Sequence, residues 1–228
     1  MKVSGMSSHN PFDFFGAIYC LTTDERNEKY ESALKEFESI GIADRIIKFN
    51  GTEIDKKYWG SNPKEQKISR ALASASHLEI WKIAEKNQLS NVLIFEDDVS
   101  FTDWNNAALT AAIHDLVKID WELFYLGYNL FGDATHYTEI ATHLIGLHTG
   151  TDIRSTHAYC LNRSAYKKIM GYNPFQSKMV DQWLPGQLKI HCLVPLMTVQ
   201  NQTIKGRQKK EMFLDNFRKI RGMNKTNR

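Results

Sequence analysis

Three consecutive acidic residues, Glu96, Asp97 and Asp98, directly follow an apolar run at residues 91–95. Such a run is typical of a parallel strand buried on both faces, and open α/β sheets bind ligands beyond the carboxyl ends of their strands. Residues i and i+2 of an extended chain face the same way, so we expect Glu96 and Asp98 to share a face and Asp97 to point to the other. Neighbouring carboxylates favour a shared proton or a bound cation. Mg²⁺ or Mn²⁺ held with diphosphate oxygens would indicate a nucleotide-type ligand.

Two other interpretations of the acidic residues stay open. In the first interpretation, the acidic residues only solvate the end of a strand or cap the next element. In the second interpretation, they belong to a metal-dependent phosphohydrolase, in which the first acid of a D-x-D pattern attacks phosphorus. The position of that nucleophile is occupied by Glu96, whose extra methylene would misplace an in-line attack. This substitution argues against the phosphohydrolase.

The rest of the chain alternates short β-rich runs with longer helical patterns, which is typical of an α/β fold. Right-handed crossovers between such units give a mostly parallel sheet covered by helices on both sides. We expect strands at residues 14–21, 45–49, 91–95, 122–127, 157–161 and 190–194. We expect helices at residues 30–40 before Gly41, from Pro63, at 104–117 and at 164–171, with a loop over 50–62.

Another helix is predicted to begin at Ser76. The segment Ser76-His77-Leu78-Glu79 has the S-x-x-E form of a capping box, and apolar residues follow it at helical spacing. His77, directly after the cap, is expected near the site, with structural packing as the alternative. Trp81 belongs to the apolar face and is expected to pack in the core.

These residues resemble glycosyltransferase family 25, the lipopolysaccharide and collagen-type galactosyl- and glucosyltransferases. The strongest element is Ser76-His77-Leu78 and Trp81, followed by the run from Asn91 to Val99. Weaker matches lie at Leu21 and Arg26, Trp121, Leu126 and Gly127, Thr156 and Tyr159, Ser164 and Ala165, Val180 and Asp181, Pro195 and Gln200. The resemblance implies a single nucleotide-sugar-binding domain of GT-A type with a Rossmann-like, mostly parallel sheet. It also implies hexose transfer from a UDP-sugar to an acceptor hydroxyl with inversion.

The resemblance also suggests roles at the metal and the donor. Asp98, assisted by Glu96 or Asp97, would hold Mn²⁺ or Mg²⁺ against the diphosphate. Arg26 would meet uracil, ribose or phosphate oxygens. Thr22, Ser76, His77 and Asp97 are expected to complete the donor site.

Asp181 is the candidate base that would accept the proton of the acceptor hydroxyl. The commoner use of Asp is a helix N-cap, and this alternative has equal weight. Trp183 follows shortly and would offer a face to a sugar ring.

Composition supports one globular domain. The chain has 228 residues, 42% hydrophobic and 24% charged, with 13 Gly and 5 Pro, which excludes disordered, collagenous and membrane-spanning classes. Three widely spaced cysteines predict buried thiols. With no secretory leader recognised near residue 1, we expect a cytoplasmic protein. Motifs of NTPases, dehydrogenases, serine hydrolases and zinc proteases are absent from the sequence.

The last residues form a basic tail. Residues 205–228 carry nine Lys and Arg against Glu211 and Asp215, a net charge of +7. Phe213, Phe217 and Ile220 recur at helical spacing, so the segment is expected to be an amphipathic helix. We divide the chain into an extension at 1–12, a transferase domain at 13–204 and this tail.

The tail leaves three partners open: the body of the protein, anionic membrane lipid, and DNA. The acceptor is expected to be a glycan such as lipopolysaccharide. The alternatives are a modified DNA base glycosylated as by virus-encoded enzymes, and a non-catalytic nucleic-acid-binding protein on a transferase fold. Oligomeric state is left open.

Overall fold

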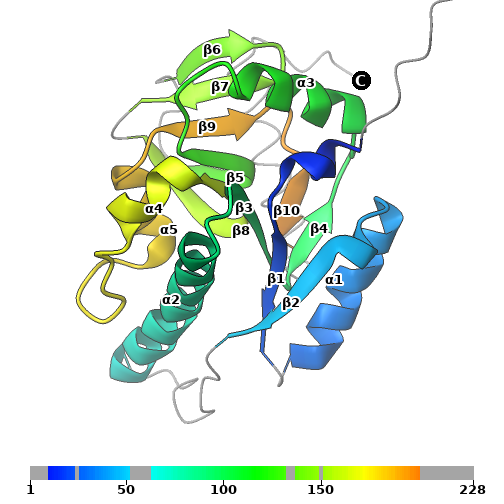
Figure 1. The fold of residues 1–228 in the computed structure, drawn as a ribbon. Helices are drawn as coiled ribbons and strands as arrows, with labels where there is room; N and C mark the ends of the chain where they lie inside the picture. Colours follow the sequence, from blue (N-terminus) through cyan, green and yellow to red (C-terminus); the bar gives the residue numbers. More distant parts are fainter. Residues whose placement is uncertain (1–9, 24–25, 52–62, 132–136, 149–150, 201–228) are drawn as a thin grey trace, which may run out of the picture.

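An eight-stranded sheet lies at the centre of the computed structural model, which describes residues 10–23, 26–51, 63–131, 137–148 and 151–200 (Figure 1). Its strands are β1 (Ile18–Thr22), β2 (Ile46–Asn50), β3 (Asn91–Glu96), β5 (Leu123–Phe131), β6 (Tyr137–Ala141), β7 (Leu144–Leu147), β8 (Asp152–Asn162) and β9 (Ile190–Leu193). They lie in the order β2-β1-β3-β8-β5-β9-β7-β6. Among these described strands, only β7 and β8 run against the common direction. The carboxyl ends of β1, β3 and β5 therefore meet at one edge.

Helices cover both faces of this sheet (Figure 1). They are α1 (Asn27–Ser39), α2 (Pro63–Lys86), α3 (Asn106–Leu116), α4 (Arg163–Ile169) and α5 (Val180–Trp183), with 3₁₀ turns η1 (Pro11–Phe14), η3 (Ala43–Arg45) and η5 (Leu184–Gly186). One core packs under α2, α4 and α5, and the other under α1 and α3. Along β3, Val92 and Ile94 enter the first core, whereas Leu93 and Phe95 enter the second. The predicted fold class, an α/β domain with a mostly parallel sheet and helices on both faces, is confirmed.

Local signals explain several helix ends. Gly41, with φ of 75°, follows the end of α1 as predicted, because glycine adopts this left-handed conformation without strain. The helix predicted at 104–117 begins later, at Asn106, because the side chain of Asn105 accepts from the backbone N–H groups of Ala107 and Ala108. The strand predicted at 14–21 is shorter, since the η1 turn precedes it and β1 begins at Ile18.

The helix start predicted at Ser76 is wrong. Helix α2 runs without interruption from Pro63 to Lys86, so Ser76 lies in its interior. Its hydroxyl donates to the carbonyl of Leu72 at 3.1 Å, one turn back, instead of accepting from an N–H in the next turn. The S-x-x-E pattern therefore lies inside the helix, because the residues of α2 that precede Ser76 are mostly good helix formers.

The order of the strands is less regular than the sequence suggested. Strand β8 runs antiparallel to both of its neighbours and lies between β3 and β5. The short strands β6 and β7 extend the sheet, and β4 (Val99–Phe101) pairs with β10 (Thr198–Gln200) in a separate two-stranded sheet. None of these four strands was predicted. Their lengths of three to five residues give a hydrophobic period too few repeats to detect.

Gly127 in β5 permits β10 to pack closely. A Cβ on Gly127 would overlap the side chains of Thr198 and His157. We expect Gly127→Ala to lower the free energy of unfolding by about 1 to 3 kcal/mol, the usual cost of overpacking. Urea denaturation measures this loss, and Gly171→Ala, where an added Cβ meets nothing within 4 Å, is the matched control. Equal stability of the two variants would contradict the prediction.

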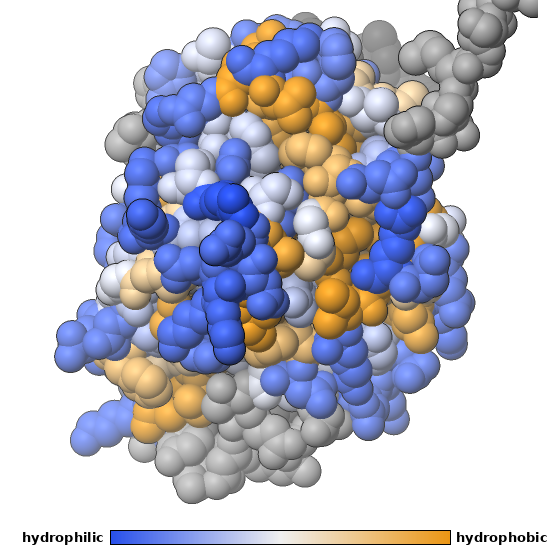
Figure 2. All heavy atoms as spheres, in the orientation of Figure 1, coloured by the Kyte–Doolittle hydropathy of each residue, from blue (hydrophilic) through white to orange (hydrophobic). Residues whose placement is uncertain are grey.

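The remaining sequence predictions concern thiols, membranes and the chain ends. The cysteines Cys20, Cys160 and Cys192 are buried free thiols, as expected. None of the described helices combines the length and apolar character of a bilayer span. Hydrophilic residues cover much of the face shown in Figure 2, with a band of hydrophobic residues that runs down from α3 and a smaller hydrophobic group at the lower left. The predicted tail at 205–228 and most of the loop at 50–62 lie outside the described residues.

Candidate functional site

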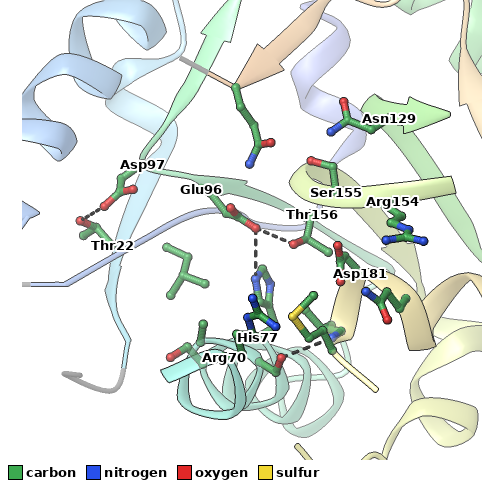
Figure 3. A pocket seen from close by; sticks show the side chains of 18 of the residues that line it. Thr22, Arg70, His77, Glu96, Asp97, Asn129, Arg154, Ser155, Thr156 and Asp181 are labelled. Carbon is green, nitrogen blue, oxygen red and sulfur yellow. Dashed lines mark hydrogen bonds and ion pairs between the residues drawn. The ribbon is translucent and has the colours of Figure 1, made fainter. Parts of the chain in front are cut away.

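A cavity of about 420 Å³ lies at the sheet edge where β1, β3 and β5 end (Figure 3). The end of β1, the beginning of α1 and Asp97 form one side of it. Asn129 and Phe131 of β5, Arg154 of β8 and Asp181 of α5 line the opposite side, and α2 lies beneath. The position agrees with the expectation that ligands bind beyond the carboxyl ends of the strands.

The positions of the three acidic residues relative to the end of β3 differ from the prediction. Strand β3 ends at Glu96, and Asp97 and Asp98 form the turn into β4. Glu96 and Asp97 line the cavity, whereas Asp98 is not part of its lining. The expectation that Glu96 and Asp98 share a face is therefore wrong, because the alternation of an extended chain stops where the turn begins.

Asp97 brings together three of the predicted donor-site residues. Its Oδ2 accepts from the hydroxyl of Thr22 at 2.8 Å, and its Oδ1 lies 3.5 Å from Nη1 of Arg26. Burial raises the pKa of Asp97, against the hydrogen bond from Thr22 and the charge of Arg26, which lower it. Thr22 and Arg26 also line the cavity, so this group forms its β1 side.

Asp98 is a carboxylate whose ionised form is destabilised by its surroundings. Its Oδ2 accepts from Nε2 of Gln200 at 3.4 Å, and its Oδ1 is buried without a hydrogen-bond partner. Burial, followed by the charges of Glu96 and Asp97, raises the pKa of Asp98 to about 7. A buried oxygen without a partner beside two further acids is the environment that a divalent cation stabilises.

The described residues contain no group of three His, Cys, Asp or Glu side chains arranged to hold a metal. Mg²⁺ and Mn²⁺ do not require such a cage, since one or two carboxylates and the phosphates of a ligand suffice. Asp97 lines the cavity and so fits a cation that is shared with a diphosphate bound there, whereas the buried Oδ1 of Asp98 would have to turn toward the cavity to join it.

Glu96 is held at the middle of the cavity by two elements. Its Oε1 accepts from the hydroxyl of Thr156 at 2.5 Å and lies 3.4 Å from Nε2 of His77 (Figure 3). Burial acts to raise the pKa of Glu96, but hydrogen bonds from His77 and Thr156 outweigh it and keep the pKa below its usual range. The structure thus places His77 against Glu96, and Ser76, its neighbour in α2, also lines the cavity.

Asp181 lies in the first turn of α5 and lines the cavity. The N-cap of this helix is Met179, so the alternative interpretation of Asp181 as the cap is wrong. Its Oδ1 is buried without a hydrogen-bond partner. Burial and then the charge of Glu96 raise the pKa of Asp181. A carboxylate with a raised pKa and a free oxygen has the properties of a general base.

Ser155 was not predicted as a site residue. Its φ of 89° is rare for a residue with a side chain. The hydroxyl of Ser155 lies 2.5 Å from Nδ1 of His157. The backbone N–H of Ser155 donates a hydrogen bond to the carboxylate of Asp181. The strained conformation thus connects β8 with α5 at the cavity wall, a feature that no sequence pattern signals.

Aromatic residues on the α5 side of the cavity also differ from expectation. Trp183 is not among the residues that line the cavity, and its ring packs 4.6 Å from the ring of Tyr172. The aromatic ring that does line this side is Phe131, which is 44% exposed, with the guanidinium of Arg154 4.9 Å from its centroid. The sugar-facing role expected of Trp183 does not fit this arrangement.

Comparisons with known proteins agree with the resemblance noted in the sequence. Rat "Probable inactive glycosyltransferase 25 family member 3" is 31% identical over 120 residues, which are 51% of this chain and 20% of that protein. The human "Inactive glycosyltransferase 25 family member 3" is 32% identical over 114 residues, 48% of this chain and 19% of that protein. The chain therefore spans about a fifth of the length of the curated relatives it matches.

Solved structures resemble the chain only distantly. One is a glycosyltransferase "involved in the glycosylation of the major capsid of PBCV-1", with 13% identity, a TM-score of 0.42, and coverage of 87% of this chain and 98% of that one. Another is the UTP-bound UGPase from Acinetobacter baumannii, with 10% identity, a TM-score of 0.45, and coverage of 92% and 79%.

The family assignment rests on a match that covers most of the domain. Residues 3–184 match the sequence model of "Glycosyltransferase family 25 (LPS biosynthesis protein)". This range includes β1, α2, β3, β8 and α5, and hence nearly all residues that line the cavity. The chain belongs to glycosyltransferase family 25.

Proposed function

We propose that the protein transfers a hexose from a UDP-sugar to the hydroxyl of an acceptor, in one displacement with inversion. The observation that carries this proposal is the distribution of carboxylates in a single cavity. Glu96 and Asp97 come from the end of β3, and Asp181 comes from α5 on the opposite side. A donor bound at the first side and an acceptor at the second would meet near Glu96.

The donor is assigned to the side formed by β1 and the acidic turn. Arg26 and Arg70 of α2 offer N–H donors to the oxygens of a nucleoside diphosphate. Thr22 and Ser76 line the same side, but their hydroxyl hydrogens are engaged by Asp97 and by the carbonyl of Leu72. Asp98 and Asp97 would hold Mn²⁺ or Mg²⁺, and the cation would offset the charge that develops on departing UDP. Glu96 is held through Oε1 by Thr156 and His77, which leaves Oε2 to face the transferred sugar between the two sides.

Asp181 is assigned as the base. Inversion requires one carboxylate to accept the proton of the attacking hydroxyl. Asp181 has an unpartnered oxygen and a raised pKa, whereas the pKa of Glu96 is lowered. Two carboxylates whose pKa values are driven apart take different roles, and the more basic one is the better proton acceptor.

The acceptor is proposed to be a glycan, such as lipopolysaccharide, and the protein is proposed to act in the cytoplasm, in solution or at a membrane surface. This acceptor rests on the family description. The matched curated relatives carry names that call them inactive, so turnover by this chain has to be measured directly.

The test is a panel of UDP-sugars in thermal unfolding, with and without Mn²⁺. A ligand that binds only the folded state raises the Tm. At a concentration 100 times its Kd, it adds about 3 kcal/mol to the free energy of unfolding. We expect one UDP-sugar to raise the Tm more with Mn²⁺ than with EDTA, and release of UDP when acceptor is added. Protection by none of the sugars would contradict the proposal, and release of phosphate from simple esters would favour the phosphohydrolase.

A further inference from the structure

A chain of buried hydrogen bonds connects Glu96 with the interior of the protein. Nε1 of Trp81 donates to the hydroxyl of Tyr159 at 2.9 Å, and the same hydroxyl lies 2.9 Å from Nδ1 of His77. Nε2 of His77 faces Oε1 of Glu96 at 3.4 Å. His77 and Trp81 are one turn apart on α2 and reach Tyr159 of β8 together. Tyr159 and Trp81 have no exposed surface, and His77 is only 3% exposed.

The direction of each hydrogen bond follows from the chemistry of its partners. An indole N–H can only donate, so the oxygen of Tyr159 accepts from Trp81. The single hydrogen of the Tyr159 hydroxyl must then go to Nδ1 of His77, since a buried hydroxyl without an acceptor is costly. In the neutral imidazole Nδ1 is therefore the acceptor, and the single ring hydrogen lies on Nε2, which faces Glu96.

This arrangement determines how Glu96 faces the cavity. The N–H of His77 and the hydroxyl of Thr156 approach the same oxygen, Oε1, from α2 and β8 respectively. Two donors on one oxygen orient the carboxylate and leave Oε2 for a ligand in the cavity. Were the ring hydrogen of His77 on Nδ1, a lone pair on Nε2 would face the carboxylate and repel it.

We propose that Trp81, Tyr159 and His77 form a positioning relay, which fixes the Nε2–H tautomer of His77 and thereby aims Glu96 at the transferred sugar. The proposal rests on the transferase function proposed above and adds a role for residues that do not touch the ligand themselves. Trp81, expected from the sequence to serve only packing, is both a core residue and the first donor of the relay.

Tyr159→Phe removes the relay with little change in shape. We expect its kcat to fall by about 10- to 100-fold, as is usual when an orienting partner is lost, with the KM for the donor within about twofold of wild type. The matched control is Tyr125→Phe. Tyr125 is equally buried and packs 6.3 Å from the ring of Tyr159, but its hydroxyl has no partner among the described residues. Tyr125→Phe should keep the kcat of wild type.

Nitrogen-15 NMR of the histidine rings tests the relay without any turnover. The wild-type spectrum should show His77, assigned by its loss in His77→Gln, with hydrogen on Nε2 and none on Nδ1. In Tyr159→Phe this pattern should change, and in Tyr125→Phe it should persist. An unchanged tautomer in Tyr159→Phe, or a wild-type ring with its hydrogen on Nδ1, would overturn the relay.

A rescue experiment separates orientation from packing. The amide of His77→Gln can still donate to Glu96, whereas His77→Leu fills the space without a donor. We expect His77→Gln to retain clearly more kcat than His77→Leu, and equal kcat in the two variants would contradict the relay. If wild type transfers no sugar, the proposed transferase function fails, and the NMR result alone decides whether the relay exists.

Discussion

Asp181→Asn should lower transfer by about 10²- to 10⁴-fold, the usual contribution of a general base, while binding of the UDP-sugar survives. The amide has nearly the shape of the carboxylate but cannot accept the proton of the attacking hydroxyl. The donor is assigned to the other side of the cavity, so its affinity should change little. Single-turnover rates measure the transfer, and the shift in Tm with UDP-sugar and Mn²⁺ measures the binding.

The control for this variant is Asp103→Asn, an exposed site whose φ of 50° Asn tolerates as well as Asp. It should behave as wild type in both assays. If Asp181→Asn unfolds at a much lower temperature than this control, Asp181 is structural. If it folds and transfers at the wild-type rate, another group is the base.

Asp98→Asn should have two opposite effects: loss of metal-dependent turnover, and higher stability of the metal-free protein at alkaline pH. The pKa of Asp98 is about 7 when folded, against about 3.9 in an unfolded chain. Between these values the folded state holds a proton that the unfolded state releases, so stability falls as the pH rises from about 4 to about 7. Above pH 7 the ionised carboxylate destabilises the fold fully, and Asn removes that cost.

Urea denaturation in EDTA at pH 8 and pH 5 measures this effect. At pH 8 we expect Asp98→Asn to be more stable than wild type by about 1 to 4 kcal/mol; at pH 5 most of the difference should vanish. With Mn²⁺ and UDP the order should reverse, because only wild type gains the cation. The exposed Asp44→Asn is the control. A destabilised Asp98→Asn at pH 8 in EDTA would contradict the interpretation of Asp98 as an acid whose ionised form is destabilised.

The acidic turn shows how far sequence reasoning reaches into this site. The apolar run before Glu96 predicted a buried strand and a site at its carboxyl end, and β3 agrees. The directions of the acidic side chains were not predictable, because the residue at which an extended chain turns depends on what pairs with the following strand. Here β4 pairs with β10, about 100 residues later, and Gln200 of β10 contacts Asp98.

Helix α2 carries a periodic signal that a helix start at Ser76 does not explain. Division of the helix at Ser76 concealed that Arg70, Ser74 and His77 follow one another at i, i+4 and i+7, the spacing of one helix face. All three line the cavity. Hydrophobic periodicity alone favours a break in the helix, because the mostly small residues at 71–75 weaken the helical pattern. The helix continues because its packing supports it.

The inserted strand β8 has a consequence for how the chain reaches its folded state. It joins β1, β2 and β3 to β5 and β9, and its register brings Asn91 opposite Asn162. During synthesis from the N-terminus, the edges of β3 and β5 remain unpaired until residues 152–162 leave the ribosome. Open strand edges attract other chains, and pairings this distant in sequence form slowly. We therefore expect the nascent protein to pass through an aggregation-prone interval, with the cavity among the last features to form.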